Sequence, residues 1–367
     1  MREINSENKL LMVLGIVEIE EDILKIGAKP MQYNRTPEYK ETLKEIFDGL
    51  QYLFQTKQPV LLVSSSGTGV MEGAVTNVLS KNDTAIVVNG GVFGERWKEI
   101  CQKHSVNVIE VKKDYGVPPT IEDIKKSLDE NPSAQAVLIT QNETSVGTLT
   151  DVRAIASLVK KYPNTLLIVD AVSSLMVEEL KMDEWGVDVV VSSGNKAVAV
   201  PPGVGFMAFS EKAQRKIPNS DNVLYNYDAQ EYLSEWNRIS TPYTPPLVIL
   251  EQLKARLRKI KEVGLEQVQQ KYRDNTAYLR TKILDLGLSF YTKDQANCVT
   301  GVLTPPHIDA SRVVEIMKNK YNIFIAPSWH DLKPKLFRVG NFGAIGKEEI
   351  DYFINSLQLT LKELGND

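Results

Sequence analysis

Two ionisable residues of the sequence stand in apolar surroundings. Lys196 follows the β-branched run VDVVVSSGN and precedes AVAVPPG, and Asp170 ends the apolar run LLIVD. Because burial disfavours an ammonium, a desolvated lysine has a lowered pKa and offers a neutral amine that can attack an aldehyde and form a Schiff base. A buried carboxylate needs a partner, and a protonated heterocyclic nitrogen is one such partner. Simpler explanations stand beside these, since a lysine can extend to solvent and an aspartate can cap a turn through Ser173 or Ser174.

A third motif is the turn Ser66-Gly67-Thr68-Gly69, which separates the run PVLLV from the helical pattern MEGAVTNVLS. Small residues let backbone N–H groups approach an anion, and a helix N-terminus favours negative charge, so this turn suits a phosphate. The same residues would also form an ordinary turn with a serine or threonine N-cap. The spacing matches neither GxGxxG nor GxxxxGK[ST], which argues against a dinucleotide fold and a P-loop.

The three features together match what pyridoxal 5'-phosphate (PLP) requires. Its phosphate needs backbone donors, its pyridine nitrogen needs an anion, and its aldehyde needs an amine. Phe93 in NGGVFGERW is placed to supply an aromatic face for the ring. The sequence therefore predicts a PLP site built from the turn at Ser66 and from Asp170, Lys196 and Phe93.

The elements that must position these groups alternate between short apolar runs and helical patterns. Buried runs that alternate with helices predict a mostly parallel α/β sheet, and ligands of such sheets bind outside the carboxyl ends of the strands. The expected strands are 59–63, 84–89, 106–111, 134–143, 165–170, 187–193 and 203–210, with helices at 71–80, 121–130 and 152–162. Polar residues follow these runs at Ser66 to Thr68, Asn89 to Gly91, Glu143 to Ser145, Asp170, and Asn195 with Lys196.

The pattern changes near Pro245. A long amphipathic helical region over 248–287 leads into a smaller α+β segment that contains CVTGVLTP, YNIFIAP and KLFRVG. A chain of 367 residues is long enough for two domains. We expect an arm outside both domains over residues 1–22, a large PLP-binding domain over 23–255 and a small C-terminal domain over 256–367.

Composition narrows the possible partners and the compartment. The net charge is −4 without a basic block, which argues against nucleic acid. The absence of an apolar run of about 18 residues and of a charged-then-apolar leader predicts a soluble cytoplasmic chain without a membrane partner. Cys101 and Cys298 lie far apart and the three histidines are scattered, so we expect no disulfide framework and no metal site.

The chain resembles the class V, fold-type I PLP-dependent aminotransferases. It is most similar to their alanine–glyoxylate, serine–pyruvate and 2-aminoethylphosphonate–pyruvate branch. The resemblance extends from about Leu10 to Leu364 and implies a large, mostly parallel domain with a smaller α+β domain. The motifs that carry it are PEYKETLKEIFDGLQYLFQT, SSGTGVMEGAV, NGGVFGERW, NETSVGTL, VDAVSSL, SGNKAVAVPPG, TPYTPPL and FRVGNFG.

The resemblance implies a role for each site residue. Lys196 would be the Schiff-base lysine, Asp170 would pair with the pyridinium nitrogen, and Arg338 would clamp the substrate carboxylate with its bidentate fork. Thr244 would close the phosphate site of the neighbouring subunit, so activity would need a homodimer with active sites at its interface. The other cofactor contacts would come from Ser66, Gly67, Thr68, Phe93, Thr144, Val172, Asn195 and Thr241.

Three departures from the family pattern concern the substrate side. In MVLGIVEIEEDI, only Gly15 is left of a Gly-Pro-rich substrate loop, and Asn34-Arg35 replaces a common His-Arg pair. Thr241 stands where a tyrosine is frequent, which removes a phenolic donor. We assign Gly15 and Asn34 to the substrate site, but the amino donor and acceptor do not follow from these residues.

The function implied is ping-pong transamination from a small amino acid of the alanine or serine type to a 2-oxo acid such as glyoxylate or pyruvate. An aminophosphonate–pyruvate transaminase, a PLP lyase of the same fold and a non-catalytic PLP-binding protein remain alternatives. A cysteine desulfurase would need a mobile nucleophilic cysteine. Cys298 has the pattern of a buried strand residue and Cys101 that of a helix residue, so neither suits this role.

Overall fold

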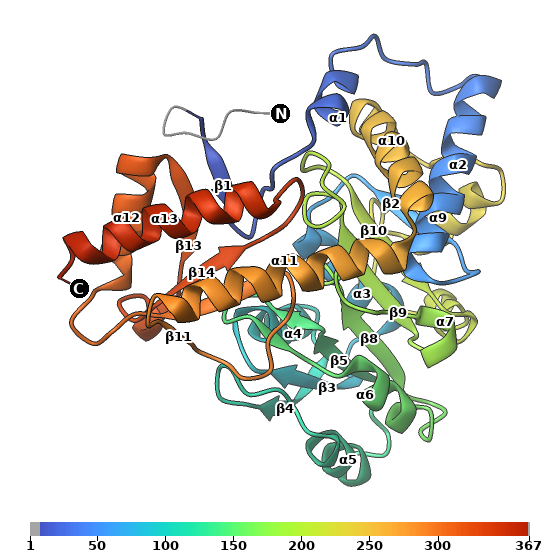
Figure 1. The fold of residues 1–367 in the computed structure, drawn as a ribbon. Helices are drawn as coiled ribbons and strands as arrows, with labels where there is room; N and C mark the ends of the chain where they lie inside the picture. The colour runs from blue at the N-terminus through green and yellow to red at the C-terminus, as the bar shows by residue number, and fades with distance from the viewer. Residues whose placement is uncertain (1–7, 366–367) are drawn as a thin grey trace.

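The computed structural model describes residues 8–365 and is built around a seven-stranded sheet with the order β2-β10-β9-β8-β5-β3-β4 (Figure 1). The strands from β9 to β4 are parallel, and β10 is antiparallel to both of its neighbours. The mostly parallel sheet predicted from the alternating runs is therefore confirmed. The strands are β2 (Val60–Val63), β3 (Thr84–Asn89), β4 (Asn107–Lys112), β5 (Ala136–Thr140), β8 (Leu166–Asp170), β9 (Val189–Ser193) and β10 (Gly205–Phe209).

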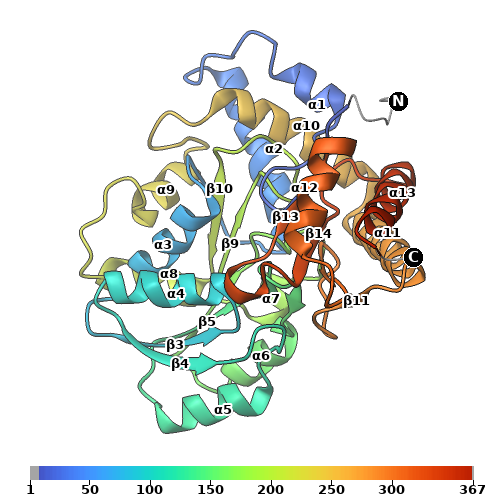
Figure 2. The same ribbon diagram turned by 90° about the vertical axis from the view of Figure 1, so that its left-hand side faces the viewer.

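Both faces of this sheet are covered, which explains why its strands are almost continuously apolar. Alternate side chains of a strand point to opposite faces, so in β3 Ala85 and Val87 join one core cluster while Ile86 and Val88 join the other. α3 and α4 cover the first face and α2 covers the second (Figure 2). The helices of this part are α2 (Pro37–Phe54), α3 (Gly67–Val78), α4 (Val92–Lys103), α5 (Ile121–Glu130), α6 (Val152–Val159), α7 (Met182–Trp185), α8 (Glu211–Gln214), η1 (Ile217–Asn219) and α9 (Ala229–Trp236).

A second sheet of five strands has the order β1-β13-β14-β12-β11 and packs against helices of the C-terminal segment. The three apolar runs predicted for this segment form its central strands. The strands are β1 (Leu10–Met12), β11 (Ser289–Phe290), β12 (Val299–Leu303), β13 (Ile323–Pro327) and β14 (Leu336–Gly340), and the helices are α12 (Ala310–Tyr321), η2 (His330–Leu332) and α13 (Lys347–Glu363). A separate hairpin joins β6 (Asn142–Glu143) to β7 (Thr148–Leu149).

The predicted arm over 1–22 is partly wrong. β1 pairs in parallel with β13, Leu10 against Ile323, and Leu10 and Met12 are buried in the core of the small sheet. A three-residue apolar run is too short for periodicity to reveal a strand, and only its distant partner orders it. α1 (Glu21–Ile26) then packs on the helix that begins at Leu247. Residues 1–7 of the expected arm lie outside the described residues.

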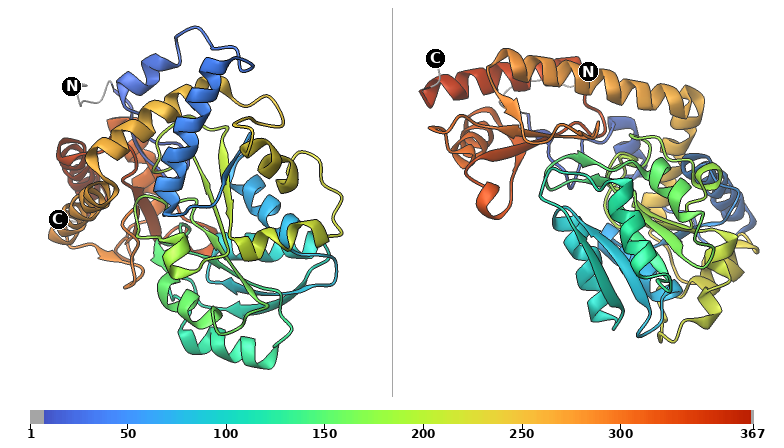
Figure 3. Two further views of the ribbon diagram at one scale, coloured as in Figure 1. Left: turned by 90° about the vertical axis from the view of Figure 1, so that its right-hand side faces the viewer. Right: turned by 90° about the horizontal axis from the view of Figure 1, so that it is seen from below.

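The helical region expected over 248–287 consists of two helices, α10 (Leu247–Val263) and α11 (Leu265–Asp285). The break is at Gly264, whose φ of 92° lies in the region that favours glycine. α10 packs on α2, whereas α11 packs on α13, so the pair connects the two sheets (Figure 3). The expected boundary after residue 255 falls within α10 and stays a prediction. In the part of the chain that the structure describes, no helix is long and apolar enough to cross a membrane.

Candidate active site

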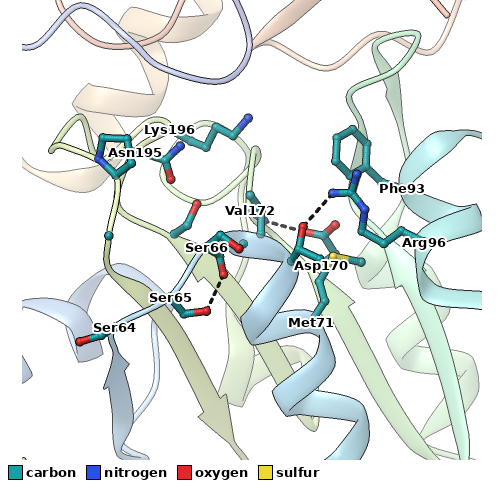
Figure 4. A pocket seen from close by; sticks show the side chains of 15 residues that line it. Ser64, Ser65, Ser66, Met71, Phe93, Arg96, Asp170, Val172, Asn195 and Lys196 are labelled. Carbon is teal, nitrogen blue, oxygen red and sulfur yellow. Dashed lines mark hydrogen bonds between the residues drawn. The ribbon is translucent and has the colours of Figure 1, made fainter. Parts of the chain in front are cut away.

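A cavity of about 610 Å³ opens at the carboxyl ends of the central strands (Figure 4). Its walls come from the β2–α3 turn, the start of α4, the end of β8 and the loop after β9. Eight of the predicted site residues line it together: Ser66, Gly67, Thr68, Phe93, Asp170, Val172, Asn195 and Lys196. Ser64, Ser65, Met71, Arg96, Ser193, Pro202 and Gly203 complete the lining.

The pairing of β8 with β9 brings Asp170 and Lys196 to one edge of the sheet. The two strands are parallel neighbours, and Asp170 at the end of β8 stands opposite Val191 of β9. Lys196 follows β9 after a short turn, and the next turn is closed by the Ala199 N–H, which donates to the Lys196 carbonyl at 2.9 Å. The strand pairing therefore places the carboxyl and the amine at one cavity, as the sequence predicted.

The Asp170 carboxyl is buried, with 3% of the residue exposed, and its Oδ1 accepts a hydrogen bond from the Val172 N–H at 2.8 Å. Burial raises its pKa to about 7. A carboxyl in this position favours a cationic partner, because pairing with a cation would offset the cost of its buried charge.

Burial lowers the pKa of Lys196 to about 8, although the nearby Asp170 charge opposes the shift. Its ammonium donates to the Leu14 carbonyl, and the neighbouring Asn195 amide donates to the Gly15 carbonyl at 2.6 Å. The N-terminal segment 13–18 therefore lies directly against the lysine. Gly15 contributes its backbone here, and it is not among the residues that line the cavity.

The β2–α3 turn presents the N-terminus of α3 to the cavity. The Ser66 hydroxyl caps the helix by accepting from the Gly69 N–H at 3.3 Å, while the first N–H groups of a helix lack intrahelical partners. A Cβ on Gly67 would stand 3.0 Å from the Val172 side chain, so glycine allows these two walls to approach. The buried Ser193 hydroxyl also lines the cavity, and it has no hydrogen-bond partner among the described residues.

Arg96 is a cavity residue that the sequence analysis missed. Its Nη1 donates to the Thr68 hydroxyl at 3.1 Å, and its guanidinium lies 4.7 Å from the centre of the Phe93 ring. The two residues share one face of α4, since they are three positions apart. The spacing of Phe93 and Arg96 in VFGERW was the sequence signal from which Arg96 could have been found. The buried Glu143 carboxylate holds the start of the helix by accepting from the N–H groups of Phe93 and Gly94.

Arg338 lies in β14 outside the cavity lining and is 6% exposed. Its guanidinium donates to the Pro327 carbonyl at 2.6 Å and to the Thr144 carbonyl at 2.9 Å, and it lies 5.8 Å from the centre of the Trp329 ring. Burial lowers its pKa to about 10. The Thr144 hydroxyl, which was expected to face the cofactor, instead bonds the Ser173 hydroxyl at 2.9 Å and does not line the cavity.

Three predicted residues lie away from this cavity within the chain. Asn34 is half-buried in the loop before α2, and Thr244 is exposed. Thr241 lines a separate cavity of about 420 Å³ together with Arg35 and Tyr243. The structure of one chain therefore does not bring Asn34, Thr241 or Thr244 to Lys196.

Both cysteines are buried, Cys101 in α4 and Cys298 just before β12. Burial raises the pKa of the Cys101 thiol to about 12 and that of Cys298 well above its ordinary value. Neither offers the exposed thiolate that a desulfurase uses. Within residues 8–365, no group of three or more His, Cys, Asp or Glu side chains is arranged to hold a metal ion.

Comparisons with known proteins agree with this geometry. A family model described as class-V aminotransferase matches residues 19–330. The chain is 32% identical to the small subunit of a soluble hydrogenase from Synechococcus sp., over 98% of this chain and 94% of that protein. It is 31% identical to alanine–glyoxylate aminotransferase of Felis catus, over 99% and 90%. A crystal structure of alanine–glyoxylate aminotransferase from Nostoc sp. superposes with a TM-score of 0.92 at 25% identity, over 98% and 96% of the two chains.

Proposed function

The chain belongs to the class-V aminotransferase family, and from this membership we propose that it moves an amino group from an alanine- or serine-type amino acid to glyoxylate or pyruvate, with Lys196 as the residue that binds PLP. It is an aminotransferase, and its family and fold imply PLP as the cofactor. The observation that carries the proposal is the placing of Asp170, Lys196 and the α3 N-terminus around one cavity.

The residues around the cavity fit PLP. Asp170 has a buried carboxyl suited to a protonated ring nitrogen, and Ser193 has a buried hydroxyl that lacks a partner among the described residues. The glycine at position 67 and the α3 N-terminus suit an anionic group. Phe93 and Val172 line the cavity as the apolar faces that would bind a flat ring between them.

When bound, PLP would supply an aldehyde for covalent attachment to the amine and a protonated ring that accepts an electron pair from the substrate Cα. Asp170 would hold the proton on the ring nitrogen, because a buried carboxylate stabilises a nearby cation. The bond from the Val172 N–H fixes the carboxyl in place.

Lys196 would move the proton at the substrate Cα as general base and acid through its Nζ. A pKa of about 8 suits this work, because the amine can then both accept and release a proton near neutral pH. The turn after β9 and the carbonyl of Leu14 determine where Nζ points.

Arg338 would orient the substrate by binding its carboxylate. Its guanidinium has five N–H donors in a fork that matches a carboxylate. The backbone carbonyls of Pro327 and Thr144 hold that fork at the junction of the two sheets. Trp329 beside it and segment 13–18 against Lys196 would form the walls that exclude water from the substrate.

The active unit that we propose is a homodimer. Thr244 is exposed and Thr241 lies in a separate cavity, so each is available to the site of a second copy rather than to its own. Mixed dimers of Lys196→Ala and Thr244→Ala chains test this arrangement. If Thr244 serves the neighbouring site, each mixed dimer contains one intact site and regains activity that neither variant has alone. If the mixed dimer does not regain activity, Thr244 does not serve the site of the neighbouring subunit.

The test of the function is a panel of amino donors and 2-oxo acceptors with the purified, PLP-loaded protein. We expect stoichiometric keto acid from alanine or serine with glyoxylate or pyruvate. Borohydride reduction followed by peptide mass spectrometry should locate the cofactor on Lys196. Bound PLP without any amino-group transfer would contradict the proposed function, and a reduced adduct on another lysine would contradict the residue assignment.

A further inference from the structure

The cavity has one cation besides Lys196 among its lining residues in the described chain, and it is Arg96. This arginine extends from α4 across the cavity toward α3 (Figure 4). Its guanidinium bonds the Thr68 hydroxyl at 3.1 Å, one residue into the first turn of α3. It therefore stands at the anion-favouring end of that helix.

The arrangement around Arg96 points to an anionic ligand. The guanidinium lies 4.7 Å from the Phe93 ring centre, a contact that restrains its position. The Ser193 residue is only 1% exposed, and its hydroxyl lacks a partner among the described residues although it lines the same cavity. Two independent groups, a restrained cation and an unpartnered buried donor, thus accompany the α3 N-terminus.

The charge of a phosphate monoester favours a cation at this place. Such a group carries about −1.5 to −2 at pH 7, and a helix N-terminus offers only about half a positive charge. Lys196 is committed to the aldehyde, and Asp170 adds a further carboxyl to the cavity. Arginine compensates the difference well, because its planar fork can donate two hydrogen bonds to one phosphate.

We propose that Arg96 binds the phosphate group of the cofactor, together with the α3 N-terminus and the Ser193 hydroxyl. The inference rests on the proposed function, since it takes PLP as the ligand. A merely positioning role is the competing explanation, in which Arg96 only holds the Phe93 ring and the α3 turn. The two explanations differ in what happens when the ligand has no phosphate.

The experiment compares PLP with pyridoxal, which has the same ring and aldehyde without the phosphate. Binding to protein freed of cofactor is followed by quenching of tryptophan fluorescence. In Arg96→Gln we expect the affinity for PLP to fall by about 10- to 100-fold and the affinity for pyridoxal to stay within about twofold, because pyridoxal has no phosphate with which the charge-assisted bond could form. An equal loss for both ligands, or no loss for either, would overturn the proposal.

Lys98→Gln is the matched control, since it removes a charge from the same helix. The Lys98 ammonium pairs with Glu110 at 3.0 Å and does not line the cavity, so the affinity ratio of PLP to pyridoxal should equal that of the wild type. Borohydride trapping of PLP on Lys196 in the wild type tests the underlying function separately. If PLP is trapped on Lys196 but the affinity ratio of PLP to pyridoxal is unchanged in Arg96→Gln, the inference about Arg96 is wrong while the proposed function stands.

A conservative variant keeps the inference testable if Arg96→Gln does not fold. Arg96→Lys retains the charge but loses the fork, so the affinity ratio of PLP to pyridoxal should fall by about threefold or more, less than in Arg96→Gln. A ratio equal to that of the wild type would count against phosphate binding by Arg96.

Discussion

The two sides of Lys196 are built in different ways. The cofactor side, which we define as the lining of the 610 Å³ cavity, is formed by strand ends and helix starts of the large sheet. The substrate side that we propose consists of segment 13–18, Trp329 and Arg338, and these residues come from opposite ends of the chain. One side follows from the topology of a single sheet, whereas the other exists only when the two sheets are packed together.

The contacts of segment 13–18 illustrate this difference. The Ala344 N–H donates to the Glu18 carbonyl at 3.0 Å, and Asn195 donates to the Gly15 carbonyl at 2.6 Å. The segment thus bonds both to the loop between β14 and α13 and to the loop that carries Lys196. We therefore expect substitutions on the cofactor side to change cofactor binding and chemistry, and those that displace the substrate side to change KM.

The largest effect is expected for Lys196→Ala. Loss of the general base and acid should lower kcat by at least about 10²- to 10⁴-fold. Keto acid release under saturating substrates measures the rate, and mass spectrometry after borohydride shows whether PLP is attached. Turnover at the wild-type rate would show that Lys196 is not the general base and acid.

Asp170→Asn should come next, with a lower kcat and an altered dependence of stability on pH. The Asp170 pKa of about 7 in the folded chain lies above its unfolded value of about 3.9, so folding takes up a proton between these values. Ionisation of the Asp170 carboxyl therefore lowers the stability of the cofactor-free fold progressively as pH rises from about 4 to 7, and the loss of stability is complete above about pH 7. We expect Asp170→Asn to raise the Tm of cofactor-free protein at pH 8 but not at pH 4. Equal Tm values of the variant and the wild type at pH 8 would show that other groups of the protein already offset the cost of the buried charge on Asp170.

Arg338→Lys tests the substrate side. Loss of the bidentate fork should lower kcat/KM by about 10- to 100-fold, chiefly through KM, while PLP affinity stays unchanged. Arg312→Lys, in an exposed pair with Glu315, is the control and should match the wild type. A comparable loss of PLP affinity in Arg338→Lys would show that the two sides cannot be separated.

The smallest effect is expected for a pair of glycine substitutions. Gly343 has a φ of 71°, and a Cβ there would stand 2.0 Å from the Glu18 carbonyl, so Gly343→Ala must displace segment 13–18. We expect a severalfold rise in KM and a lower Tm, since a left-handed alanine alone costs about 1 kcal/mol. A Cβ on Gly15 meets nothing within 4 Å, so Gly15→Ala should be close to neutral in both measurements. A larger rise in KM for Gly15→Ala than for Gly343→Ala would show that Gly15 itself contacts the substrate.

Most of the cofactor side could be predicted from the sequence because it depends on local order. The runs LLIVD and VDVVVSS are buried parallel strands, and parallel strands end at one edge of a sheet. Asp170 and Lys196 therefore converge without any knowledge of the rest of the chain. Arg96 was missed because its role depends on Thr68, which α3 brings from 28 positions away.

The substrate side could be predicted only in part. Arg338 follows from the motif FRVGNFG, but its partners Pro327 and Thr144 do not. The bond between the hydroxyls of Thr144 and Ser173 also reflects packing that spacing cannot reveal. The expected place of Thr244 depends on a second chain and remains a prediction, as does the expected place of Asn34 at the substrate site.

By itself, the sequence determined the parallel sheet and the residues at its carboxyl edge, because periodicity and strand ends are local properties. Only the tertiary structure decided that β1 joins the small sheet, that the helical region breaks at Gly264, and that the Leu14 carbonyl meets the Lys196 amine across 182 positions. The physical reason is that such contacts arise from the packing of distant elements, and short segments like β1 have no order of their own until a partner strand satisfies their backbone.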